Sequence, residues 1–252
     1  MRRMIFAGIV ALTAGLSGLM AQTPAQQPKP KSNGERKAVM AIQTATTSND
    51  PDAIIKAAED LLNNYADSDF KEYALTMEAK AYEMKRDEDN AQVYADRVLQ
   101  INPKSYTMQL LIANAITPNI KEHDLNYKDE VAKVTKLYND AIENAKVALK
   151  PNPQIPDADW ENQKKWIQAE AYNGLGMLAS IQKNDDDSIK YFQLAVDNDP
   201  EQDAYATRLA NAYLAAGKKP EAIALCDKLL AKPNLHPQIK AVVTNIKNAA
   251  SH

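Results

Sequence analysis

The chain has 252 residues, with 30 basic and 33 acidic side chains and a formal net charge of −3 at pH 7. This mixed, mildly acidic balance excludes the concentrated basic face that nucleic-acid binding requires, and it argues against an electrostatic tether to membranes. Cys226 is the one cysteine, so an internal disulfide is excluded. The scarcity of glycine beside abundant Ala, Lys, Gln and Glu favours an all-helical chain.

The first residues have the pattern of a secretory signal peptide. Arg2 and Arg3 form a short basic start, the stretch from Ile5 to Met20 is apolar, and Ala21 offers a small residue for cleavage. We expect a signal peptide over residues 1–21, whose removal takes the formal charge from −3 by two units to −5. The alternative is an uncleaved membrane anchor. The apolar stretch from Ile5 to Met20 is short for this role, because a stable membrane span needs about 20 apolar residues. This pattern indicates a bacterial envelope, with the periplasm as the first expectation and secretion as the second.

Residues 22–33 are rich in Pro, Gln and Lys, which is the composition of a disordered linker. Helical periodicity begins near Glu35. The absence of a cysteine directly after the apolar run excludes an acylated N-terminal cysteine as an anchor.

One pattern occurs twice in the second half of the chain, at a spacing of 34 residues. The small residue Gly176 would let a second helix cross closely, and Phe192 would fill the space around the crossing. Pro200 would end that second helix because it cannot continue the hydrogen-bond ladder. The five residues of the first copy and their counterparts are Leu175, Gly176, Ser188, Phe192 and Ala195, then Leu209, Ala210, Ala222, Cys226 and Leu229.

These residues and their spacing resemble the tetratricopeptide repeat, with Ala179 replacing one of the family's aromatic residues. The resemblance implies an all-α fold, a right-handed superhelix of helix–turn–helix repeats. The small residue at the crossing is present in every proposed unit: Ala41, Ala79, Ala113, Gly176 and Ala210. The units span residues 34–67, 72–105, 106–155 with an insertion, 169–202 and 203–236.

The middle of the chain is irregular. Residues 106–116 and 128–149 are expected to form a helix pair, separated by an insertion at 117–127, and a longer helix is expected from about 158 to 183. In the last full unit, Gly217 suits a left-handed helix cap. Residues 237–252 form the end of the chain, where an amphipathic helix is expected to cap the stack.

Catalytic motifs are missing from the sequence, and we expect neither an enzyme, nor a cofactor, nor a metal site. His123 lies in the insertion, where a metal would need ligands from elsewhere. Asp185–Asp187 and residues 197–203 suggest calcium, but the required Gly and Glu positions of a calcium loop hold Gln202 and Arg208. Helix capping is the preferred interpretation of both acidic runs.

Two further side chains attract attention because of their chemistry. Cys226 falls at a repeat position that packs between helices, so we interpret it as a small buried residue rather than a nucleophile. Trp160 and Trp166 are six residues apart and do not share a helical face. Burial is expected for Trp166, which is next to Ile167.

The resemblance implies that the first helix of each unit lines a concave surface. Asparagine amides there can donate and accept hydrogen bonds, and an arginine can bind a carboxylate with two N–H groups. The family's specific carboxylate-binding arrangement is not reproduced, so no particular ligand is inferred. The candidate groove residues are Lys80, Asn114, Asn173, Met177, Arg208 and Asn211.

We therefore expect a non-catalytic scaffold of the cell envelope that binds a protein or peptide partner of unknown identity in this groove. One alternative is a structural subunit of an envelope assembly that docks through its convex face and insertion. Another is a ligand-binding or enzymatic site within residues 117–166, and a third is a spacing element without a groove ligand.

Overall fold

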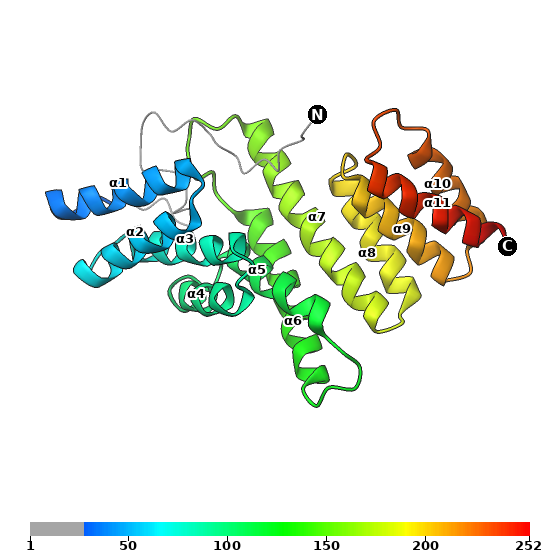
Figure 1. Ribbon diagram of the computed structural model, residues 1–252, viewed down its shortest axis with the longest axis horizontal. Helices are drawn as coiled ribbons and strands as arrows, with labels where there is room; N and C mark the ends of the chain where they lie inside the picture. The colour runs from blue at the N-terminus through cyan, green and yellow to red at the C-terminus, as the bar shows by residue number, and fades with distance from the viewer. Residues whose placement is uncertain (1–27) are drawn as a thin grey trace. The chain divides into compact units, whose positions relative to one another are not determined.

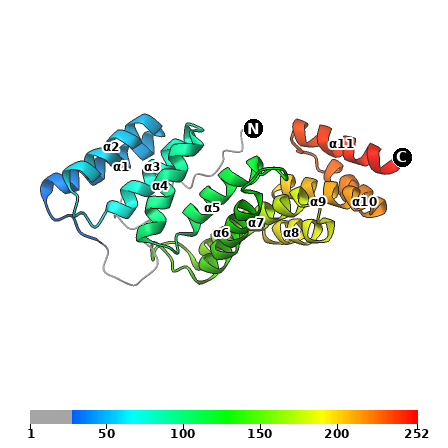
Figure 2. The same ribbon diagram turned by 90° about the horizontal axis from the view of Figure 1, so that it is seen from below.

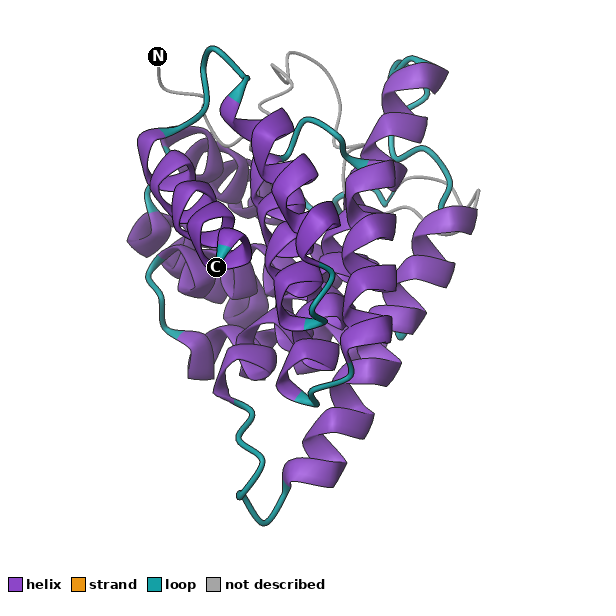
Figure 3. Cartoon of the chain, turned by 90° about the vertical axis from the view of Figure 1, so that its right-hand side faces the viewer, coloured by secondary structure: helices purple, strands orange, loops and turns teal. Residues whose placement is uncertain are grey.

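The computed structural model describes residues 28–252, so the expected signal peptide and the first half of the expected linker lie outside the described residues. Across residues 28–252 the chain is helical throughout, with eleven α-helices, one short 3-10 helix and no strand (Figure 3). The expected all-α fold is confirmed. None of the described helices combines the length and the apolar composition needed to cross a membrane.

The described chain divides into two compact units. Unit 1 comprises residues 28–108 and 148–156, and unit 2 comprises residues 109–147 and 157–252. Helix α5 (Tyr106–Ile116) begins in unit 1 and continues in unit 2. Unit 1 otherwise contains α1 (Asn33–Ser48), α2 (Pro51–Asn64), α3 (Lys71–Met84) and α4 (Glu88–Ile101). Unit 2 contains η1 (Thr117–Asn119), α6 (Tyr127–Val147), α7 (Asp157–Ile181), α8 (Asp185–Asn198), α9 (Asp203–Ala215), α10 (Lys219–Leu230) and α11 (Pro237–Ser251).

In unit 1, consecutive helices pack against one another around an apolar core that includes Val39, Ile42, Leu61 and Phe70. The start of α1 is fixed by polar contacts. The Ser32 Oγ accepts a hydrogen bond from the Glu35 backbone N–H at 3.0 Å, and the Ser68 Oγ donates to the Glu35 Oε1 at 2.6 Å. The buried Glu35 carboxylate is thus satisfied, as burial of a charge requires.

The turn between the two helices of a pair has the same backbone conformation in four pairs. One residue there adopts a positive φ: Asn49 at 55°, Arg86 at 59°, Lys183 at 56° and Gly217 at 70°. The expected left-handed cap at Gly217 is confirmed, and Lys183 stands 34 residues before it. A left-handed residue at a helix end lets the chain reverse and satisfies the last carbonyl groups.

In unit 2, the close crossing expected at Gly176 is present. A Cβ atom on Gly176 would lie 2.6 Å from the ring of Phe192, so only glycine fits between α7 and α8 at this separation. Figures 1 and 2 show α9, α10 and α11 side by side, and α11 packs against both earlier helices. Val243 and Ile246 of α11 share a core with Leu229 and the fully buried Cys226.

The burial of the two tryptophans differs from the expectation that Trp166 is buried. Trp160 is 5% exposed, whereas Trp166 is 51% exposed, so the expected burial of Trp166 was wrong. The reason is helical geometry: α7 is 25 residues long, and its buried face carries Trp160, Ile167, Ala171 and Leu178, while Trp166 points away from this face.

Candidate functional site

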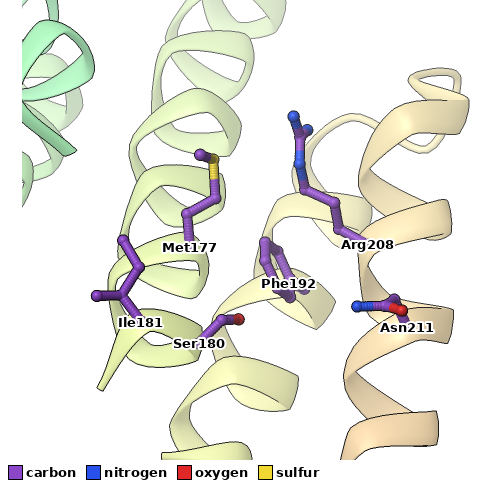
Figure 4. Close-up of a pocket in the computed structure, with 6 residues that line it drawn as sticks. All are labelled: Met177, Ser180, Ile181, Phe192, Arg208 and Asn211. Carbon is purple, nitrogen blue, oxygen red and sulfur yellow. The ribbon is translucent and has the colours of Figure 1, made fainter. Parts of the chain in front are cut away.

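A hollow of about 240 Å³ lies on unit 2 between α7, α8 and α9. Phe192 of α8 lies between the side chains contributed by α7 and those contributed by α9, as Figure 4 shows. The six lining residues are Met177, Ser180, Ile181, Phe192, Arg208 and Asn211.

The repeat pattern positions these side chains. Leu175 and Gly176 of α7 are buried, as are Leu209 and Ala210 of α9, because these pairs pack into the helix crossings. The residues immediately beside them, Met177 on α7 and Arg208 on α9, are only partly buried. The hollow is therefore the exposed side of the same helices whose other side forms the core.

Arg208 is the charged group of the hollow. Its Nη1 donates a hydrogen bond to the Asn173 Oδ1 at 3.1 Å, and among the described residues no carboxylate lies within ion-pair distance of it. Desolvation by burial lowers the pKa of Arg208, and Tyr205 opposes this change. The guanidinium nevertheless remains protonated at every physiological pH. The hollow thus combines an uncompensated positive charge with the apolar surface of Met177, Ile181 and Phe192.

Asn173 holds Arg208 in this position. While its Oδ1 accepts the hydrogen bond from Arg208, its Nδ2 contacts the Met177 Sδ at 3.9 Å. Asn211, one helical turn beyond Arg208, is exposed at the edge of the hollow. Four of the six predicted groove residues, Asn173, Met177, Arg208 and Asn211, therefore come together.

Asn114 has a different environment from the one predicted for a groove residue. Its Nδ2 donates to the Glu170 Oε1 at 2.8 Å, and its Oδ1 accepts from the Tyr138 hydroxyl at 2.9 Å. That hydroxyl also lies 3.0 Å from the Thr117 Oγ1, which donates to the Ala113 carbonyl. Asn114 is therefore part of an internal polar network joining α5, η1, α6 and α7, and it does not line the hollow.

Lys80 belongs to α3 of unit 1 and is likewise not a lining residue of the hollow. Desolvation by burial lowers the pKa of its ammonium group, and Glu83 partly offsets this effect. Its role in a binding surface stays a prediction.

Three lining residues were not among the predicted groove residues: Ser180, Ile181 and Phe192. Ile181 follows Met177 by four positions on the same helix, a spacing that places both on one face and could have identified it. Ser180 lies between them and forms a hydrogen bond with Ser188 of α8 at 2.7 Å. Phe192 was assigned to the helix crossing, and it serves both the crossing and the floor of the hollow.

The residues considered for metal binding do not converge. No group of three or more His, Cys, Asp or Glu side chains within the described part of the chain is arranged to hold a metal ion. His123 is exposed in the turn before α6. Asp185–Asp187 form the first turn of α8, where the Asn184 side chain accepts a hydrogen bond from the Asp187 N–H at 3.2 Å.

The fold and the hollow define a helical-repeat protein whose paired helices expose a mixed polar and apolar face. The family model described as tetratricopeptide repeat matches residues 182–246, and the chain shares its fold with solved structures of tetratricopeptide-repeat proteins. In general, this fold is that of a protein–protein interaction scaffold, and the family is generally non-catalytic.

Solved structures with the same fold share little sequence with this chain. A thermophilic tetratricopeptide-repeat protein from Thermus thermophilus is 14% identical, with a TM-score of 0.55 over 84% of this chain and 98% of that chain. A structure of MamA protein is 18% identical, with a TM-score of 0.57 over 78% of this chain and 90% of that chain. Among curated proteins, no sequence matches this chain significantly.

Proposed function

We propose that this protein is a non-catalytic scaffold whose C-terminal repeats bind an extended segment of a partner protein over the hollow between α7, α8 and α9. The observation that carries the proposal is Arg208, a half-buried cation that is oriented by Asn173 and has no carboxylate partner among the described residues. A buried charge is costly unless it is paired, so a partner that supplies a carboxylate gains a strong hydrogen-bonded contact there.

The apolar part of the hollow specifies the rest of the partner. Met177, Ile181 and Phe192 offer a surface for one apolar side chain, and Asn211 at the edge offers an amide for the partner's backbone. The best-fitting partner is therefore a segment with a carboxylate adjacent to an apolar side chain. Only a few such anchors need to provide most of the binding energy.

We also propose that the protein acts in the bacterial cell envelope, with the periplasm as its first location. The support is the basic start, apolar run and small-residue cleavage site within residues 1–21. The mildly acidic composition supports a protein partner over nucleic acid.

A second candidate, docking through the irregular middle of the chain, is favoured by exposed apolar side chains in unit 2. Leu125 in the turn before α6 is fully exposed, and Trp166 and Val147 are each more than half exposed. Large exposed apolar residues often mark interaction surfaces. Trp166→Ala therefore serves as the variant that distinguishes the two candidates.

We expect peptides selected from a displayed random library against the purified protein to carry a carboxylate beside an apolar residue. Arg208→Ala should weaken their binding roughly 10- to 100-fold in calorimetric titration, because a charge-assisted hydrogen bond in a partly buried site contributes about 1.5–3 kcal/mol. The matched control is Lys228→Ala, which removes an exposed cation on α10 and should change affinity by less than about twofold.

Neutralising the peptide carboxylate should cost the wild type as much as Arg208→Ala does, and it should cost the variant almost nothing. Full affinity in Arg208→Ala, together with loss of binding in Trp166→Ala, would reject the hollow and support docking through the middle of the chain.

A further inference from the structure

Unit 1 contains a glutamate at a position that the two C-terminal repeats fill with a leucine. Glu78 directly precedes the small crossing residue Ala79, just as Leu175 precedes Gly176 and Leu209 precedes Ala210. Leu175 and Leu209 are buried in their helix crossings. Glu78 is buried in the same way as these two leucines, so its carboxyl group lies inside the packing between helices.

Glu78 is fully buried, at 0% exposure, and neither of its carboxyl oxygens forms a hydrogen bond of good geometry, although the Tyr94 side chain lies close enough to lower its pKa. Buried polar groups are nearly always hydrogen-bonded, and an ionised carboxylate without a partner is especially unfavourable. The contrast with Glu35, which is equally buried but accepts a hydrogen bond from Ser68, shows that unit 1 can satisfy a buried carboxylate. The carboxyl group of Glu78 has no comparable hydrogen bond.

The charged and titratable groups around Glu78 come from α2, α3 and α4: Glu59, Tyr82, Tyr94 and Arg97. The Tyr82 and Tyr94 rings stack with their centroids 5.4 Å apart, and the Arg97 guanidinium lies 5.0 Å from the centroid of the Tyr94 ring. Arg97 is therefore held over an aromatic face and forms no ion pair with Glu78.

Burial raises the pKa of Glu78 to about 7; Tyr94 and Arg97 act in the opposite direction, and Glu59 adds to the rise. The carboxyl group is thus neutral in the packed helix pair below neutral pH. Burial also raises the pKa of Tyr94 to about 12, so this hydroxyl stays protonated throughout.

We propose that Glu78 makes the α3–α4 helix pair a pH-sensitive element: the neutral carboxyl group permits close packing, and its ionisation loosens α3 from α4. Water can then reach the carboxylate, which is the stable environment for the charged form. The open form is favoured as pH rises, because an exposed glutamate releases its proton at lower pH than the buried one does.

Hydrogen exchange of the α3 and α4 backbone amides in the full chain tests the proposal. After correction for intrinsic exchange rates, the opening equilibrium of the wild type should rise roughly 30-fold between about pH 5.5 and about pH 8.5. In Glu78→Gln, which has the same size but cannot ionise, the change should stay below about twofold. The matched control is Glu88→Gln, which removes an exposed carboxylate from α4 and should retain the wild-type pH dependence.

Carbon NMR of the Glu78 carboxyl group in the wild type gives an independent result. A titration midpoint near neutral pH is expected, and a midpoint at about pH 5 or below would overturn the proposal. The same pH dependence of exchange in the wild type and in Glu78→Gln would overturn it as well. Glu78→Leu, which introduces the residue of the two C-terminal repeats, replaces Glu78→Gln in this comparison if the amide variant does not fold.

Discussion

Replacing Gly174 with alanine is expected to destabilise unit 2 by about 3 kcal/mol, although alanine is the better helix former by about 1 kcal/mol. A Cβ atom at this position would lie 2.1 Å from the ring of Tyr138, which is 1% exposed and cannot move into free space. The intrinsic preference of the helix and the packing thus predict opposite signs, and packing has the larger magnitude.

The cost is large because Tyr138 is fixed at both ends. Its ring fills the contact between α6 and α7, and its hydroxyl bonds to Asn114 and lies 3.0 Å from the Thr117 Oγ1. Shifting the ring would separate these polar atoms within a buried region, at a cost of about 1–3 kcal/mol for each unsatisfied group. Gly174 therefore stabilises the same network that contains Asn114.

Tryptophan fluorescence during denaturation measures this effect, because Trp160 and Trp166 are the two tryptophans of the chain and both belong to unit 2. Tyr138→Leu provides the control background, since the smaller side chain leaves room for a methyl group. In that background Gly174→Ala should cost less than about 1 kcal/mol. An equal loss in both backgrounds would show that the contact with Tyr138 is not the cause.

Replacing Glu78 with leucine is expected to stabilise unit 1 by about 3 kcal/mol above about pH 8, and by much less near pH 5. The sign follows from the raised pKa of the folded state, about 7 against 4.5 for the ordinary group. Below pH 4.5 both states are protonated and ionisation costs nothing. As pH rises from 4.5 to about 7, the unfolded chain ionises first, so wild-type stability falls, and above about pH 7 the loss is constant.

Leucine removes this pH-dependent loss and matches the residue that the two C-terminal repeats use at the same position. Denaturation monitored by circular dichroism, with the unit 2 transition fixed from tryptophan fluorescence, gives the stability of unit 1 at both pH values. Equal gains at the two pH values would show that leucine acts through packing alone. Glu78→Gln should remove the pH dependence while giving a smaller gain, because the amide also lacks a hydrogen-bond partner.

The spacing of 34 residues was sufficient to predict the helix crossings. Gly176 against Phe192 and the left-handed Gly217 depend on local chain geometry that repeats at that spacing, so both were predictable. The environment of Asn114 was not predictable from the sequence, because it depends on hydrogen bonds to Tyr138 and Glu170. These two residues lie on other helices and meet Asn114 only in the folded chain. Glu78 was visible as a charged residue at an aliphatic repeat position, but its lack of a partner is a property of the packed helices.

Part of the hollow was also within reach of sequence reasoning. The alignment of the repeats predicted that Asn173 and Met177 lie on the concave face of α7 and Asn211 on that of α9, with Arg208 close to this face. All four residues are found at the hollow. Trp166 was assigned wrongly because α7 is longer than a repeat helix, so its first turns do not follow the repeat alignment.

The central claim, that the hollow binds a partner protein, is tested most directly by site-specific photocrosslinking in the cells that produce this chain. A photoreactive residue would replace Asn211 at the edge of the hollow, and the matched control would replace exposed Lys228 on α10. We predict a crosslinked partner from position 211 that is lost when Arg208→Ala is added, and no such product from position 228. A partner captured equally from both positions, or one that persists in Arg208→Ala, would contradict the claim.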